Sequence, residues 1–256
     1  MNADRANAPV RVLTASQPLA WLARGWRDFL RAPGPSLLHG ALFLVAGLSI
    51  VLAGWGRAGL LAGAFSGFLL VAPILVAGLY EVSRRLARGE LPSLRDALGV
   101  WIEGGAAMFR LGLLLGALGT LWVALSTVII LGTTRGAHAG VEDFLREFVL
   151  SPNWLPFALW LAAGGMLAAL VFALTVVSAP MMLDREVGLA DAALTSVRAV
   201  GANPAAMAVW AALVMAVTLA GIALVLPMIV LVPVLGHATW HAYTDTVDAS
   251  GLAPRL

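Results

Sequence analysis

The sequence predicts an all-α fold, namely a polytopic transmembrane helix bundle with six spans in three hairpins and short cytoplasmic amphipathic helices. Composition is the first reason: 61% of the residues are hydrophobic and 12% are charged, whereas soluble domains have roughly 45–50% and about 25%. The second is that apolar runs of about 18–25 residues recur, the length that crosses the hydrocarbon core. Backbone groups in lipid must pair within their own segment, so these runs are predicted to be helices.

Charge and cysteine content exclude several classes of function. All 16 basic residues are arginines, the net charge is +2, and the arginines are spread along the flanks of the apolar runs, so we expect no nucleic-acid binding. The absence of cysteine excludes disulfides, thiolate metal sites and cysteine nucleophiles. The first 36 residues are polar, and the first long apolar run starts at Leu37, so no cleavable signal peptide is expected.

The N-terminal region is predicted to be a disordered cytoplasmic tail over 1–16, followed by an amphipathic helix over 17–32. One face of that helix is apolar and consists of Leu19, Leu22, Trp26, Phe29 and Leu30. The opposite face carries Arg24, Arg27, Asp28 and Arg31. Two placements remain open: the helix lies on the membrane surface, or it packs as a cap against the bundle.

Residues 33–245 are predicted to be a single transmembrane domain, followed by a cytoplasmic tail over 246–256. The first four spans are expected at about 37–53, 59–80, 106–131 and 154–183. The polar segments 81–103 and 184–204 are predicted to lie inside, and the acidic loop 132–152 outside. Ser93 and Asp96 resemble a helix-starting cap.

The last apolar stretch, 205–244, has two interpretations. One helix of that length would be about 60 Å long, twice the membrane core. A hairpin that turns near Leu226 and Pro227 gives two helices of about the right length, because proline is tolerated in a first helical turn. The hairpin is favoured, with one long kinked helix as the alternative.

Three proline-containing motifs suggest an internal repeat. Ala72-Pro73, Ala179-Pro180 and Val232-Pro233 stand at similar places in the second helix of each predicted pair. The chain therefore reads as three copies of a short amphipathic helix followed by a membrane hairpin. The rival interpretation is a chance alignment of Ala- and Leu-rich helices.

Arginine placement predicts the orientation, because arginine concentrates in cytoplasmic loops. With the N-terminus inside, the inner segments hold five arginines before residue 37, four in 81–103, two in 184–204, and Arg110 and Arg255. The outer loops hold only Arg57, Arg135 and Arg146. Both termini are therefore predicted to be cytoplasmic.

Histidines give the only candidate metal or haem ligands. His237 and His241 are four residues apart and share a helical face, and His39 is expected at the same membrane level, with Glu81 as the nearest carboxylate. The favoured alternative is an interfacial anchor whose rings face headgroups or the backbone of a neighbouring helix. We predict no catalytic residue and no cofactor.

Small residues form ridges on two predicted spans: Gly59, Gly63 and Gly67 on one, and Gly112, Gly116 and Gly119 on the other. Such ridges allow close helix packing within a bundle or between subunits. No Asp or Glu lies near a predicted midplane, which argues against a proton-coupled carrier.

Several motifs resemble a bacterial family of predicted integral membrane proteins, catalogued as domain of unknown function 2189. They are the runs Ser178–Arg185, Asn203-Pro204 with Trp210–Leu213, and Leu235–Tyr243. The resemblance covers most of the chain from about residue 30 and implies a location in the inner membrane. It brings no established activity and no catalytic residues.

The leading hypothesis is a non-enzymatic accessory, assembly or scaffold subunit whose partners are the lipid bilayer and either another membrane protein or a second copy of the chain. One alternative is a transporter or lipid-handling protein built on the repeat. Another is a haem- or metal-binding protein using His237 and His241.

Overall fold

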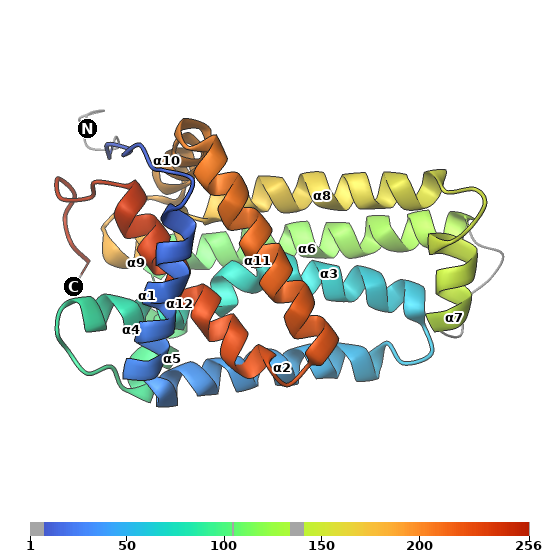
Figure 1. Cartoon of the computed structure of the whole chain (residues 1–256), viewed down its shortest axis with the longest axis horizontal. Coiled ribbons are helices and arrows are strands. Elements are labelled where there is room, and N and C mark those ends of the chain that lie inside the picture. The colour runs from blue at the N-terminus through green and yellow to red at the C-terminus, as the bar shows by residue number, and fades with distance from the viewer. Residues whose placement is uncertain (1–7, 104, 134–140, 256) are drawn as a thin grey trace. The chain divides into compact units, whose positions relative to one another are not determined.

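A computed structural model describes residues 8–103, 105–133 and 141–255, and these described ranges are helical with no strand (Figure 1). In chain order the helices are α1 (Gln17–Arg31), α2 (Pro33–Ala53), α3 (Ala58–Leu75), α4 (Ala77–Ala87), α5 (Leu94–Glu103), α6 (Gly105–Thr133), α7 (Val141–Phe144), the π-helix η2 (Leu145–Val149), α8 (Leu155–Thr175), α9 (Ser178–Asp184), α10 (Leu189–Ala202), α11 (Pro204–Leu224) and α12 (Met228–Thr246). The all-α prediction is confirmed.

Five helical stretches among the described residues are long and apolar enough to cross a membrane. They are Pro33–Ala53, Ala58–Ala87, Gly105–Thr133, Leu155–Asp184 and Pro204–Leu224. The sequence predicted six, and α12 is the helix that differs. Its first half is apolar, but its second half carries the polar residues His237, His241, Tyr243 and Asp245, which lower its hydropathy.

The described residues fall into two compact units. Unit 1 contains the residues up to Leu44, then Pro73–Gly112, and those from Phe172 onward. Unit 2 contains Val45–Ala72 and Leu113–Val171.

Two of the long helical stretches are broken within unit 1, and a side chain from the next amphipathic helix bonds to the backbone at each break. Near the break after α3, the indole of Trp101 on α5 donates to the carbonyl of Ile74 at 3.1 Å. At the break before α9, the Val177 amide donates to Ser196 Oγ on α10 at 3.1 Å. A helix break leaves backbone groups without helical partners, and these side chains supply partners there.

The prolines of the predicted repeat stand differently at these breaks. Pro73 lies inside α3, before its last two residues, whereas Pro180 is the third residue of α9 and follows its break. Pro233 lies inside α12, which continues to Thr246. The correspondence between the first two helix pairs is therefore in the order of elements and not in the place of the proline.

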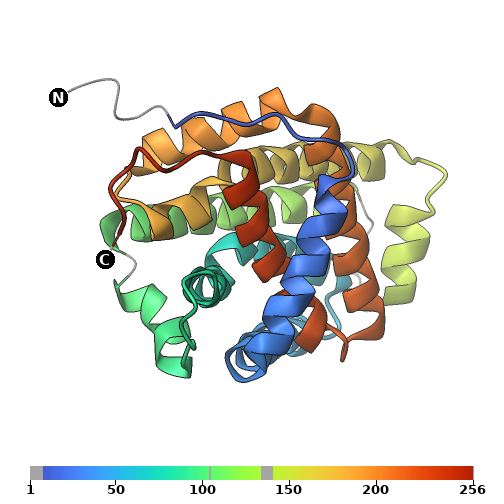
Figure 2. The same ribbon diagram turned by 60° about the vertical axis from the view of Figure 1, so that its left-hand side comes forward.

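In unit 1, α1 lies along α12, as both views show (Figures 1 and 2). Trp21 is fully buried and meets Trp210 of α11 edge to face, with ring centroids 5.6 Å apart. Gly25 lets the two helices approach, because a Cβ there would stand 2.6 Å from the Val234 carbonyl oxygen. This packing corresponds to the cap alternative.

Leu19, Trp26 and Leu30, on the predicted apolar face, are exposed. The predicted faces of α1 are wrong at Asp28. The buried face consists of Pro18, Trp21, Gly25, Asp28 and Phe29, so a predicted polar-face residue is buried. The reason is that Asp28 finds hydrogen-bond partners on α4 and α12, which offsets the cost of burying a carboxylate.

The prediction of disorder over 1–16 is wrong for residues 8–16, while residues 1–7 lie outside the described part. Val10 pairs with Val247 in an antiparallel bridge, and the Arg11 amide donates to the Thr246 carbonyl at 2.8 Å. Asn203 accepts from the Leu13 amide at 2.7 Å. These pairings place the segment around Val10 beside the segment around Val247. Amino-acid composition does not predict such pairings.

In unit 2, the predicted glycine ridge of α3 packs against α6. A Cβ at Gly59, Gly63 or Gly67 would stand 2.8–2.9 Å from the nearest atoms of Ile130, Ser126 and Val123 respectively. The ridge therefore serves packing within the chain.

The part of the acidic loop that the structure describes is helical and anchored by aromatic rings. Phe148 of η2 is buried and meets Phe157 edge to face, with centroids 5.8 Å apart. The Trp160 indole donates to Ser126 Oγ at 2.6 Å. Residues 134–140 of this loop lie outside the described part.

Candidate functional site

A chain of buried hydrogen bonds joins four helices of unit 1 around the second half of α12. On α1, Asp28 Oδ2 accepts from Ser83 Oγ at 2.7 Å and from His241 Nε2 at 2.8 Å. His237 Nδ1 lies 2.8 Å from Ser83 Oγ, and His237 Nε2 lies 2.9 Å from Ser36 Oγ. The order along this polar chain is Ser36, His237, Ser83, Asp28, His241.

The bonding pattern assigns the protons. Ser83 gives its one hydroxyl proton to Asp28, so its oxygen accepts from His237 Nδ1–H. Ser36 donates its hydroxyl proton to the Ala32 carbonyl at 2.6 Å, and its oxygen also lies 2.9 Å from His237 Nε2. The carboxylate can only accept, so His241 Nε2 carries a proton.

Asp28 is ionised within this chain. Burial raises the pKa of its carboxyl, but the hydrogen bonds from His241 and Ser83 outweigh burial and hold the pKa below its usual range. A carboxylate only 6% exposed is stable there because donors from α4 and α12 surround it.

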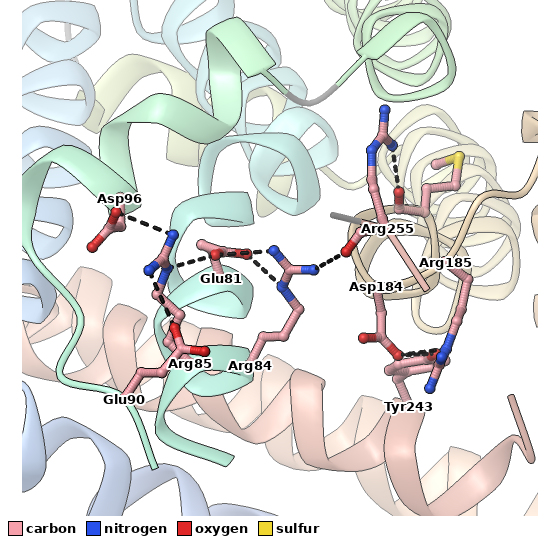
Figure 3. Close-up of polar contacts among 10 residues, drawn as sticks. Glu81, Arg84, Arg85, Glu90, Asp96, Asp184, Arg185, Tyr243 and Arg255 are labelled. Carbon is pink, nitrogen blue, oxygen red and sulfur yellow. Dashed lines mark hydrogen bonds and ion pairs between the residues drawn. The ribbon is translucent and has the colours of Figure 1, made fainter. Parts of the chain in front are cut away.

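A second cluster, of ion pairs, surrounds Glu81 of α4 (Figure 3). Glu81 accepts two bonds from Arg84, at 2.7 and 3.1 Å, and one from Arg85 at 2.8 Å. Arg85 also lies 3.2 Å from both Glu90 and Asp96. The Ser93 hydroxyl and amide hold the pKa of Asp96 below its usual range, and the predicted cap at Ser93 is present.

The ion-pair cluster extends to α9 and the C-terminal segment. Arg84 Nη1 donates to the Arg255 carbonyl at 3.0 Å, and Arg255 Nη1 donates to the Met182 carbonyl at 2.7 Å (Figure 3). Asp184 accepts from the Tyr243 hydroxyl at 2.8 Å and pairs with Arg185 at 3.1 Å. The cluster thus ties α4, α9 and α12 to the end of the chain.

A third group lies where α1 begins. Asp245 accepts from Gln17 Nε2 and from the Trp21 indole, each at 2.9 Å, and forms a two-pronged pair with Arg24. The partners are α1 and the last turn of α12. All three groups therefore connect elements that are distant in sequence.

The candidate metal ligands do not converge. His237 and His241 do share a face of α12, but both ring nitrogens of His237 are bonded to serines. His39 bonds to the Pro35 carbonyl through Nδ1, and its Nε2 abuts the backbone of Gly78, where even a Cβ would overlap it. The described residues hold no group of three His, Cys, Asp or Glu side chains arranged to bind a metal.

The anchor alternative also needs correction in its detail. His237 is fully buried; its ring bonds to buried serine side chains and also interacts with the backbone of Leu79 on α4. The carboxylate beside the histidines is Asp28, whereas Glu81 pairs with arginines. Ser36, Ser83 and Asp28 were missed because each is an ordinary small polar residue until α1, α2, α4 and α12 come together.

Comparison with known proteins adds a family. Residues 60–184 match the DUF2189 family, described as predicted integral membrane protein. The resemblance stated from the sequence is confirmed over this range, which takes in Ser178–Asp184 but not the Leu235–Tyr243 motif. No curated protein and no solved structure matches the chain.

Proposed function

We propose that this protein is a non-enzymatic protein of the bacterial inner membrane that acts as an accessory, assembly or scaffold subunit for a membrane-protein partner. The observation that carries the proposal is that the polar side chains of unit 1 bond mainly to one another and to backbone. The acids, bases and hydroxyls of the three clusters bond to one another and to backbone, so they hold helices together.

The pairing of the chain ends supports a topology with both termini on one side of the membrane. Because Val10 pairs with Val247, the chain between them crosses an even number of times. Four crossings are α2, α3–α4, α6 and α8–α9, and α11 with α12 enters and returns as a pair. The arginine distribution puts the shared side in the cytoplasm.

The outward face of α1 suits contact with the cytoplasmic leaflet. Leu19, Trp26 and Leu30 are 59%, 47% and 58% exposed, with Arg27 and Arg31 also exposed beside them. Apolar and aromatic side chains next to arginine are typical of helices at the headgroup boundary. In this arrangement α1 packs one face on α12 and turns the other to lipid.

The test is the size of the protein's complex at natural abundance. The tagged chain is extracted in mild detergent and run on a native gel, followed by denaturing separation. We expect a discrete band well above the 26.6 kDa chain, containing one stoichiometric protein partner. A chain that migrates alone at every detergent-to-protein ratio contradicts the proposal.

A matched variant tests whether the protein acts as a scaffold or whether its histidines bind a haem or metal. His241→Gln keeps a donor toward Asp28 but removes the imidazole. A scaffold retains its native-gel complex with this variant, and the purified protein carries no stoichiometric haem or metal before or after the change. Loss of the complex together with a bound metal contradicts the proposal.

A further inference from the structure

We propose that α11 and α12 form a re-entrant hairpin. Both helices enter from the side that holds the chain ends, and the turn Val225–Pro227 stays inside the hydrocarbon, covered by lipid acyl chains. The inference rests on the even-numbered topology proposed above and replaces two of the six predicted spans with a hairpin that does not reach the opposite surface.

The sequence through the turn is the first observation. Residues 219–236 contain no polar side chain, although they include the end of α11, the turn and the first half of α12. The α2–α3 turn, by contrast, presents exposed Trp55 and Arg57, as a turn at the membrane surface does. A turn that faced water would gain nothing from eighteen consecutive apolar residues.

The backbone of the turn is the second observation. The amides of Val225, Leu226, Met228 and Ile229 donate to the carbonyls of Gly221, Leu224, Val225 and Leu226 at 2.7, 2.8, 3.1 and 3.2 Å, and Pro227 has no amide proton. Hydrocarbon offers no water to an unpaired amide, so irregular backbone at depth must be bonded internally. This turn meets that requirement.

The backbone of Val225 is strained by this hydrogen bonding. Its φ is 59° and its ψ −70°, which is a γ-turn conformation that is rare and strained for a β-branched residue. The strain allows the Leu226 amide to reach the Leu224 carbonyl at 2.8 Å. A turn in water would not need that bond.

Depth is the third observation. The backbone of Ile229 lies directly against Gly40, where a Cβ would overlap the Ile229 carbonyl. Gly40 is seven residues after the start of α2, about 10 Å along a helix that is about 31 Å long. The turn is two to four residues beyond Ile229, at most about 6 Å further, so it lies near mid-depth.

The direction of α12 agrees with this depth. From Ile229 beside Gly40, α12 runs to His237, which bonds to Ser36 in the first turn of α2. The helix therefore moves toward the start of α2 and ends at Thr246, next to the N-terminal segment. Both of these contacts with α12 lie in the first third of α2.

The occupant of the outer side of the turn is lipid acyl chain. Leu224 and Leu226 are 64% and 71% exposed, and Met215 and Leu219 of α11 are also exposed. From Leu219 through the turn the side chains are apolar, and the turn's amides are already bonded. Hydrocarbon chains are the partners that such a surface requires.

The experiment uses the natural absence of cysteine. Single-cysteine variants Leu226→Cys, Arg57→Cys and Ser250→Cys of the full chain are treated with a membrane-impermeant maleimide, in spheroplasts and in inverted vesicles. We expect Arg57→Cys to react in spheroplasts and Ser250→Cys in inverted vesicles. Leu226→Cys should react in neither preparation, and fully after denaturation in SDS.

The results separate this inference from the topology that it rests on. If Leu226→Cys reacts from the same side as Arg57→Cys, the hairpin crosses the membrane completely. If it reacts from the same side as Ser250→Cys, the turn lies outside the hydrocarbon. Either result overturns the inference. If Arg57→Cys and Ser250→Cys react from one side, the topology fails independently.

A second measurement identifies what covers the turn. A nitroxide attached at Leu226→Cys, in liposomes, should relax strongly with molecular oxygen and weakly with a water-soluble nickel complex. Leu52→Cys, 71% exposed near the other end of α2, should show more nickel access. Weak relaxation of the Leu226 nitroxide by both agents means that protein covers the turn and overturns the inference.

Discussion

His241 Nε2 lies 2.8 Å from Asp28 Oδ2 and joins α12 to α1 across most of the length of the chain. The carboxylate is buried between an imidazole and the Ser83 hydroxyl, and those donors hold its pKa below its usual range. This contact explains why Asp28, which the sequence placed on the polar face of the N-terminal helix, is buried.

The first prediction concerns this docking. Asp28→Ala leaves His241 and Ser83 without their shared acceptor, and a lost buried charge pair costs roughly 2–4 kcal/mol. We expect a clear drop in the unfolding temperature of the detergent-solubilised protein. The control Asp143→Ala, at an exposed position on α7, should leave it unchanged.

The second prediction is a pH dependence. Because the folded-state pKa of Asp28 is lowered, its contribution to stability is complete above the unfolded pKa of about 3.9 and is lost as the pH falls through the folded value. The stability difference between the natural protein and the Asp28→Asn variant should shrink as the pH falls below about 4. A difference that grows on acidification would refute the assignment.

The third prediction concerns the close approach of α2 and α12. Gly40→Ala puts a methyl group into the Ile229 backbone, and overpacking of this kind costs about 1–3 kcal/mol. The matched control on the same helix is Gly34→Ala, where a Cβ meets nothing within 4 Å, and which should be neutral or slightly stabilising. Equal unfolding temperatures for the two variants would contradict the packing.

The fourth prediction concerns the glycine ridge in unit 2. Gly63→Ala brings a Cβ to 2.9 Å from Ser126 Oγ, which also accepts from Trp160. We expect loss of stability and a shift in the tryptophan emission. Gly116→Ala, in open space on α6, is the control and should change neither.

Apolar runs predicted the long helices well. The run 37–53 became Pro33–Ala53, and 106–131 became Gly105–Thr133, because length and hydropathy alone decide where a chain can cross lipid. Local sequence does not show which side chains bond to backbone near the breaks at Val76 and before Ser178. They are Trp101 and Ser196, from helices later in the chain.

The polar chain shows the limit of a one-dimensional argument. His237 and His241 were found from their spacing, which fixes a shared face within one helix. Their partners Ser36, Ser83 and Asp28 lie on three other helices, and no local pattern distinguishes them. The helical pattern also placed Asp28 on the exposed face of α1, where the structure buries it.

We propose that the paired ends of this integral membrane protein lie in the cytoplasm. This placement is tested by reporter fusions at residues 90, 140, 190 and 256, each read with a cytoplasm-active and a periplasm-active reporter. We expect cytoplasmic signals at 90, 190 and 256 and a periplasmic signal at 140. A periplasmic signal at 256 contradicts the proposal: with a cytoplasmic signal at 90 it would mean an odd number of crossings, against the pairing of Val10 with Val247, and with a periplasmic signal at 90 it would place both ends outside.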